Sequence, residues 1–212
     1  MHPNEEATLG RSVTFSETKR NTSRGFSMVE LAVSLTVMLI LTGIAIPSLM
    51  RSFRTYQLND ATTRLSDLLK FTRFEAVRRN TPVTLRLQQA GADWNVWTDS
   101  DGDTVEDATE KQILITGFAT LLPASGLPGT GAFAAVLGPS TFTIMSGSNG
   151  TVTYDARGAV RVGGAIASSV LVFYLGGVAS PEYGYRAVLL LPSGAVQLWT
   201  APPSGGTWLR IG

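Results

Sequence analysis

The sequence predicts an α+β protein in which one long N-terminal helix packs its second half on an antiparallel β-sheet domain. Residues 26–50 form a nearly uncharged apolar run, and about 20 such residues suffice to cross a bilayer as a helix. Residues 51–80 repeat apolar side chains at spacings of three and four, as an amphipathic helix does. Residues 81–212 change to a spacing of two, which is typical of strands. Residues 1–25 precede these segments as a hydrophilic leader.

The apolar run carries one charge, Glu30, at the fifth position after Gly25. A carboxylate inside a bilayer costs about 2.5 kcal/mol or more, so it needs a partner. Cleavage between Gly25 and Phe26 would provide one, because the new α-amino group of Phe26 can neutralise Glu30 of a neighbouring subunit. We therefore expect the leader to be removed and Glu30 to direct assembly.

Two simpler interpretations of this segment explain fewer of its features. A secretory signal peptide has an apolar core of about 7–15 residues and is cut after that core, whereas here the run is longer and the junction precedes it. A plain signal anchor fits the length but gives no role to Glu30 or to Gly25-Phe26. The basic residues of the leader cluster beside the span, as expected for a cytoplasmic flank. Residues 51–212 should then lie on the other side of the membrane, anchored by a single pass; in a two-membrane bacterium these would be the periplasm and the inner membrane.

The predicted helix continues from Arg51 to Arg79 without glycine or proline and stops at Asn80-Thr81-Pro82. Its apolar stripe contains Phe53, Leu58, Ala61, Leu65, Leu68, Leu69, Thr72 and Ala76. Its other face is basic, with Arg51, Arg54, Arg64, Lys70, Arg73, Arg78 and Arg79. That face is either solvated or in contact with anionic lipid or a partner.

The head is predicted to begin with a hairpin whose strands contain residues 83–88 and 94–98, joined by a turn at 90–93. Further strands are expected at 111–116, 141–145, 151–155, 170–175, 185–191 and 195–200. Residues 117–140 are rich in Gly, Ala and Pro and carry no charge. We expect a long loop there, with one short strand at most, that either contacts other subunits or covers the core.

An acidic loop follows the predicted strand 94–98. Six carboxylates fall within the twelve residues 99–110, and oxygen ligands at alternating positions suit Ca²⁺. With Asp99 as position one, positions three, five, nine and twelve are Asp101, Asp103, Asp107 and Glu110. Three features argue against an EF-hand. Glycine is at position four, Thr104 is at position six where an EF-hand loop turns sharply at a glycine, and no helix is predicted before the loop. The loop is therefore either a Ca²⁺ site or a solvated acidic turn, and no other cofactor is expected.

Composition argues against an enzyme. The chain has no cysteine, and its one histidine, His2, lies in the leader. A serine nucleophile would need an unusual base, and the two lysines beyond the leader, Lys70 and Lys111, have no partner motif nearby. The net charge of +1 does not indicate a nucleic-acid partner.

The segment Arg24-Gly25-Phe26-Ser27-Met28-Val29-Glu30 resembles the prepilin-peptidase signal of type IV pilins and type II secretion pseudopilins. Pro47, the twenty-second residue counted from Phe26, lies where this family commonly carries a helix-kinking proline. The resemblance implies cleavage by prepilin peptidase, N-methylation of Phe26 and assembly with other pilins through the N-terminal helix. Glu30 and Pro47 would be assembly residues.

Four further stretches resemble the GspH/FimT family: residues 71–85, the Trp94–Thr98 strand with its acidic loop, the turn Tyr154-Asp155-Ala156-Arg157-Gly158, and the closing hairpin Leu191-Pro192-Ser193-Gly194-Ala195-Val196. This resemblance implies a β-sandwich head and a minor pilin or type II secretion minor pseudopilin. The absence of cysteine favours a minor subunit, since many major pilins close a loop with a disulfide.

DNA binding during DNA uptake is the alternative function, because some members of this family bind DNA. Their Gly-Arg-x-Arg run corresponds here to Gly194-Ala195-Val196-Gln197, so both arginines are absent. The nearest cations are Arg186 and Arg210, and Trp199 and Trp208 could either stack on bases or pack in the core. Whether a pilus or a secretion system uses the protein, and whether it lies at the tip or in the shaft, stays open.

Overall fold

The computed structural model describes residues 25–122, 127, 140–141, 145–146, 149–204 and 208–212. The chain divides into two compact units, Met1–Ile44 and Ala45–Gly212. The predicted leader, apart from Gly25, and most of the predicted loop 117–140 lie outside the described residues.

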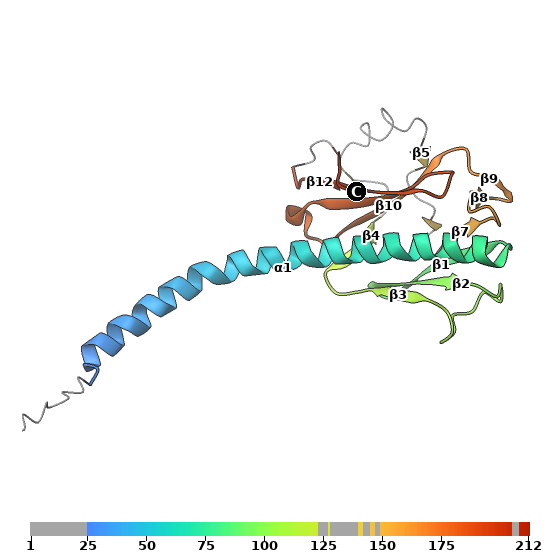
Figure 1. The fold of residues 1–212 in the computed structure, drawn as a ribbon. Helices are drawn as coiled ribbons and strands as arrows, with labels where there is room; N and C mark the ends of the chain where they lie inside the picture. The colour runs from blue at the N-terminus through green and yellow to red at the C-terminus, as the bar shows by residue number, and fades with distance from the viewer. Residues whose placement is uncertain (1–24, 123–126, 128–139, 142–144, 147–148, 205–207) are drawn as a thin grey trace, which may run out of the picture. The chain divides into compact units, whose positions relative to one another are not determined.

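The helix α1 (Met28–Arg79) runs through both predicted helical segments and contains Pro47 (Figure 1). Ser27 caps its start: its carbonyl accepts from the Leu31 amide at 3.0 Å and its Oγ from the Val29 amide at 3.3 Å. An oxygen side chain at this position satisfies an otherwise unpaired amide of the first turn. The helix ends where Asn80 turns to a φ of 53° and Pro82 follows, because proline disfavours helical backbone in the residue before it.

The second half of α1 buries one face, as its spacing predicts, with two differences. Phe53 was expected in the stripe, but its side chain is 61% exposed, so that prediction was wrong. The buried face of the helix begins only at Leu58, more than one turn later. Glu75 was not expected there but is buried, with 5% exposed. The buried residues are Leu58, Ala61, Thr62, Leu65, Ser66, Leu68, Leu69, Thr72, Glu75 and Ala76.

Within the described residues the first sheet has seven strands, and the pairings among them are antiparallel. Its main order is β3-β2-β1-β7-β8-β9, with β6 pairing β7 at the side. The predicted hairpin is present as β1 and β2, with Ala90 opposite Asp93 at its turn. The bounds are β1 (Val83–Ala90), β2 (Asp93–Asp99), β3 (Gln112–Ile115), β6 (Met145–Ser146), β7 (Asn149–Tyr154), β8 (Val160–Val162) and β9 (Ala165–Ile166).

The second sheet has six strands in the part of the chain that the structure describes, in the main order β13-β12-β11-β10-β4, with β5 pairing β10. The two-residue β5 pairs in parallel, and the other pairings are antiparallel. A 3₁₀ turn, η1 (Pro181–Tyr183), joins β10 to β11. The bounds are β4 (Ala119–Leu122), β5 (Ser140–Thr141), β10 (Val170–Gly177), β11 (Tyr185–Leu190), β12 (Val196–Ala201) and β13 (Leu209–Arg210).

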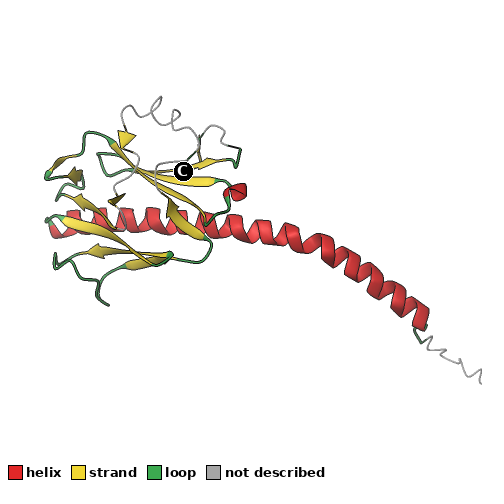
Figure 2. Cartoon of the chain, turned by 180° about the vertical axis from the view of Figure 1, so that it is seen from behind, coloured by secondary structure: helices red, strands yellow, loops and turns green. Residues whose placement is uncertain are grey.

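The main core joins the helix to both sheets. It contains Leu65 and Leu69 of α1, Leu85 of β1 and Phe173 of β10. Figures 1 and 2 agree in placing β1–β3 on one side of the last turns of α1 and β10 and β12 on the other. A second cluster, with Tyr174, Trp199 and Trp208, lines the other face of the second sheet. The predicted fold class is confirmed: a long helix packed on an antiparallel, sandwich-like head.

Candidate functional site

The candidate processing site lies just before α1. Gly25 and Phe26 are exposed and non-helical, and the helix begins two residues later, at Met28. A Cβ built on Gly25 would meet no described atom within 4 Å. The side chain of Phe26 is 77% exposed. A non-helical, uncovered peptide of this kind is what an enzyme that cuts between the two residues would need to reach.

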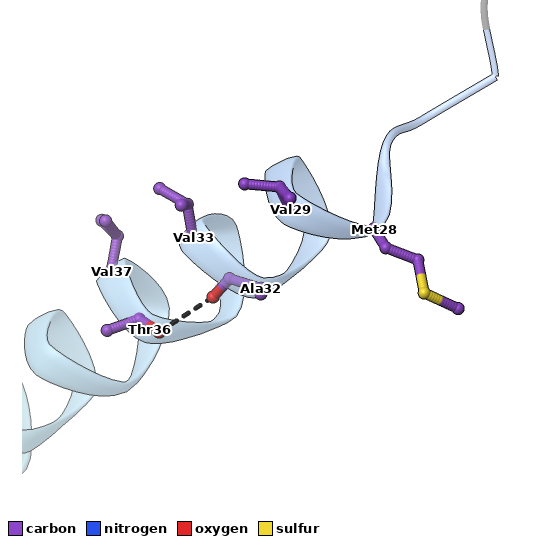
Figure 3. A pocket seen from close by; sticks show the side chains of 6 residues that line it. All are labelled: Met28, Val29, Ala32, Val33, Thr36 and Val37. Atoms are coloured by element: carbon purple, nitrogen blue, oxygen red, sulfur yellow. Dashed lines mark hydrogen bonds between the residues drawn. The ribbon is translucent and has the colours of Figure 1, made fainter.

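The first half of α1 exposes apolar side chains all around. The exposed fractions of the large apolar residues from Phe26 to Met50 range from 46% to 90%. Figure 3 shows Val29, Val33 and Val37 pointing to one side, four residues apart, while Met28 points away. Among the described residues, α1 is the helix that is long and apolar enough to cross a membrane.

Three hydroxyl groups of this half, those of Ser34, Thr36 and Thr42, donate hydrogen bonds to the backbone of the helix. Thr36 donates from Oγ1 to the carbonyl of Ala32 at 2.8 Å (Figure 3). Ser34 donates to the carbonyl of Glu30 at 2.7 Å. Such bonds satisfy hydroxyls within one helix. The Glu30 carboxylate is exposed and has no hydrogen-bond or ion-pair partner among the described residues.

The acidic loop connects β2 to β3. It brings carboxylate oxygens of Asp99, Asp101 and Asp103 within 4.8 Å of one another. Asp107, predicted with them, does not belong to that group; its Oδ1 accepts from the amide and the hydroxyl of Thr109. Glu110 is 7% exposed and accepts from the Ser100 amide through Oε1 at 2.7 Å.

Two arginines that the sequence analysis does not connect with this loop hold it in place. Arg86 of β1 donates from Nε to Asp99 Oδ2 at 2.5 Å, and the Asp99 side chain is fully buried. Arg79, in the last turn of α1, donates from Nη1 to the carbonyl of Ser100 at 2.8 Å. The register that sets Thr84 opposite Asp99 and Arg86 opposite Trp97 is the signal that could have found the first pair. The contact between Arg79 and Ser100 can be found only from the tertiary fold.

The side chains proposed for DNA contact are engaged within the head. Arg186 is 8% exposed and donates from Nε to Asn59 Oδ1 at 2.7 Å, and its burial lowers the pKa of its guanidinium. Trp199 and Trp208 are 5% and 2% exposed and belong to the second core cluster. The packing interpretation of both tryptophans is therefore confirmed. Arg210 is exposed and donates to the carbonyl of Gly212 at 3.2 Å.

Most cations on the basic face of α1 contact the head. Arg64 donates to the carbonyl of Leu114 at 3.1 Å, and Arg54 lies over the Phe118 ring at 4.7 Å. Arg73 donates to the carbonyl of Gly158. Such contacts hold the helix against the head through its arginine side chains, in addition to the packing of its apolar stripe.

Two family models match the chain. Residues 61–194, more than half of the chain, match the model described as type II transport protein GspH. Residues 20–46 match the model described as the prokaryotic N-terminal methylation motif. No curated protein and no solved structure gives a significant match. Neither match gives support to the DNA-binding alternative.

Proposed function

Since the chain belongs to the family of type II transport protein GspH, we propose that it is a minor pilin or pseudopilin cut by prepilin peptidase and assembled through its N-terminal helix. One observation carries the proposal. A single carboxylate, Glu30, lies in an exposed apolar helix, five residues beyond an uncovered Gly25-Phe26 junction, inside the match to the methylation motif.

The apolar surface of residues 26–50 needs an apolar environment. Fully burying one large apolar side chain is worth about 1.5–3 kcal/mol, and the stretch exposes many of them. A bilayer supplies that environment before assembly, and neighbouring helices of other pilins supply it afterwards. The valine row of Figure 3 fits the second case, because β-branched side chains hold one rotamer in a helix and present a stiff ridge to a neighbour.

Glu30 gives the assembly its register. Its carboxylate has no partner within the described part of the chain, and leaving it unpaired among apolar helices costs free energy. The α-amino group of Phe26, created by cleavage and then methylated, is the cation we assign to it. The pair forms between subunits, so it favours one axial offset between neighbouring helices.

The test is Glu30→Ala in the full-length chain, with Ser34→Ala as the matched control. Ser34 lies one turn away, and its hydroxyl satisfies only the carbonyl of Glu30, so its loss should not affect assembly. We expect Glu30→Ala to insert into the membrane and to be cleaved normally, but to lower the assembled fraction by about tenfold or more. A tenfold change corresponds to a loss of about 1.4 kcal/mol of free energy from the pair between Glu30 and Phe26. Equal incorporation of Glu30→Ala and wild type would refute the role of the carboxylate.

A further inference from the structure

A short part of α1, residues 51–57, lies between the apolar run and the face of the helix that packs on the head. The apolar run ends before it, at Met50. Leu58, directly after it, is fully buried and begins the packed face. Within residues 51–57 no side chain is buried. This junction segment therefore belongs neither to the expected membrane span nor to the core of the head.

The junction segment exposes two aromatic rings. Phe53 is 61% exposed and Tyr56 is 70% exposed. They continue a row of exposed apolar side chains that begins inside the apolar run with Ile46 and Leu49. The steps along this row are three, four and three residues, so its members share one face of the helix. The next residue on that face is Asp60, a carboxylate in an ion pair, so the apolar row ends at Tyr56.

The two cations of the junction segment differ in what they contact. Arg54 is held by the protein, because its Cζ lies 4.7 Å from the centroid of the Phe118 ring and its Nη1 donates to Gln57 Oε1 at 3.3 Å. Arg51 is exposed, and within the described residues no hydrogen bond or ion pair engages its side chain. The segment contains no acidic residue. Arg51 is therefore available to an anionic group outside the chain.

Distance along the helix places the junction segment at the level of lipid headgroups. An α-helix rises about 1.5 Å per residue, so Phe53 and Tyr56 lie about 38 and 42 Å along α1 from its first residue, Met28. The hydrocarbon core of a bilayer is about 30 Å thick, and the headgroups bring the total to about 40–45 Å. With Met28 at the cytoplasmic edge of the hydrocarbon, both rings lie beyond the hydrocarbon on the side of the head.

We propose that Arg51, Phe53 and Tyr56 bind phospholipid headgroups on the head side of the membrane and so hold the subunit at one depth before assembly. The inference rests on the proposed function, because it needs the apolar run to span a bilayer. Tyrosine is enriched at membrane–water interfaces, since its ring can rest on the acyl boundary while its hydroxyl stays in water. An arginine at the end of a span extends its guanidinium to the interface, where lipid phosphates accept its hydrogen bonds.

A neighbouring pilin helix is the other occupant that an exposed ridge could have. A single helix covers one side of α1, whereas Arg51 and Phe53 are two residues apart and point to different sides. A lipid surface surrounds the helix and meets both side chains at the same level. The row is also continuous with the exposed apolar side chains of the run itself. Lipid therefore accounts for both groups, and a neighbouring helix accounts for one.

The test uses the absence of cysteine from the chain, which allows one nitroxide label to be attached at a chosen residue. Full-length Phe53→Cys and Tyr56→Cys are placed in vesicles of phosphatidylethanolamine and phosphatidylglycerol at a low ratio of protein to lipid. Collisions of the label with oxygen, which concentrates in lipid, and with a water-soluble nickel chelate report its depth. Leu41→Cys is the reference inside the span, and Phe74→Cys, 60% exposed on the same helix, is the matched aromatic reference in water.

We expect the ratio of oxygen to nickel collisions to fall in the order Leu41, Phe53, Tyr56, Phe74. The proposal is overturned if the labels at Phe53 and Tyr56 give the same ratio as the label at Phe74. It is equally overturned if both labels are shielded from both reagents, as contact with a neighbouring helix would shield them. A label at Leu41 that reads as water would instead refute the membrane span, and with it the proposed function.

A charge reversal tests the arginine separately. Arg51→Glu sets a carboxylate against the lipid phosphates, so it should shift the label at Tyr56 towards water. Lys70→Glu makes the same change in charge farther along the helix, at a side chain that is 59% exposed, and should leave the label where it is. An unchanged label position in Arg51→Glu would overturn the role of Arg51.

Discussion

Arg73 of α1 donates a hydrogen bond from Nε to the carbonyl oxygen of Gly158, 3.1 Å away, and so fixes the helix to a turn of the first sheet. A second turn lies against the same arginine: a Cβ on Gly194 would lie 2.7 Å from Arg73 Nε. The two turns are themselves joined by the amide of Val160, which donates to the carbonyl of Pro192 at 2.9 Å. Three segments far apart in the sequence thus meet at one guanidinium group.

Gly194→Ala should destabilise the head. Gly194 has a φ of 80°, and an added Cβ would lie 2.2 Å from the carbonyl oxygen of Gly158. Left-handed backbone alone costs a non-glycine residue about 1–3 kcal/mol, and the clash adds to that. The control is Gly163→Ala, which has a φ of 58° and open space around its Cβ. Thermal melts should show a larger loss of Tm for Gly194→Ala; equal losses would show that the contact is unimportant.

Glu75 should make the folding stability of the protein depend on pH in the acidic range. Hydrogen bonding from Arg78, and next from Arg79, lowers the pKa of this buried carboxyl to about 2 from its usual 4.5, against desolvation, which raises it. A pKa lowered on folding stabilises the protein above the unfolded value and loses that contribution as the pH falls. The contribution of Glu75 should therefore be present above about pH 4.5 and disappear between pH 4.5 and 2.

The measurement is the Tm of wild type and Glu75→Gln across that pH range. The difference between them should shrink towards pH 2, although both will still lose stability, because the Asp155 pKa is also lowered, chiefly by the Ala159 amide. Asp67→Asn is the control: Asp67 pairs with Lys70, and both side chains are more than half exposed, so the pair contributes little. A Tm difference for Glu75→Gln that does not change with pH would contradict this assignment.

Pro47 should weaken α1 locally. Proline has no amide hydrogen to donate to the carbonyl four residues earlier, that of Gly43, and its ring crowds that carbonyl. Pro47→Ala restores this donor, so amides near residue 47 should exchange more slowly with deuterium in detergent, and the helix axis should straighten. Ile46→Ala changes a neighbour without adding a donor and serves as control. Unchanged exchange and an unchanged axis in Pro47→Ala would refute its role as the point of bending.

The sequence could predict the elements whose pattern is periodic over many residues. The helix to Arg79 and the strands β1, β2, β7, β10, β11 and β12 follow from apolar spacing. The short strands β8, β9 and β13 have two or three residues each, too few for any period to show. These strands form because neighbouring strands supply hydrogen-bond partners for their backbone.

Charged residues were harder to place than apolar ones. Glu75 looks like a surface residue of a helix, yet Arg78 and Arg79 make its burial tolerable by pairing with both of its oxygens. Arg186 likewise looks available for a ligand, yet it reaches Asn59 on a helix 127 residues away in the chain. The pairs of Glu75 are three and four residues apart on one helix and are a local pattern. The burial of Glu75 and the bond between Arg186 and Asn59 depend on tertiary contacts that no local pattern encodes. The acidic loop was visible from composition alone, but the burial of Glu110 was not.

The most direct test of the central claim is the intact mass of the protein extracted from its native membrane. If the chain is processed as a pilin, its mass should equal that of residues 26–212 with one added methyl group on Phe26. Fragmentation should place that methyl group on the α-amino nitrogen. A mass equal to that of the whole chain, with residues 1–25 retained, would contradict the claim that a prepilin peptidase prepares this protein for assembly.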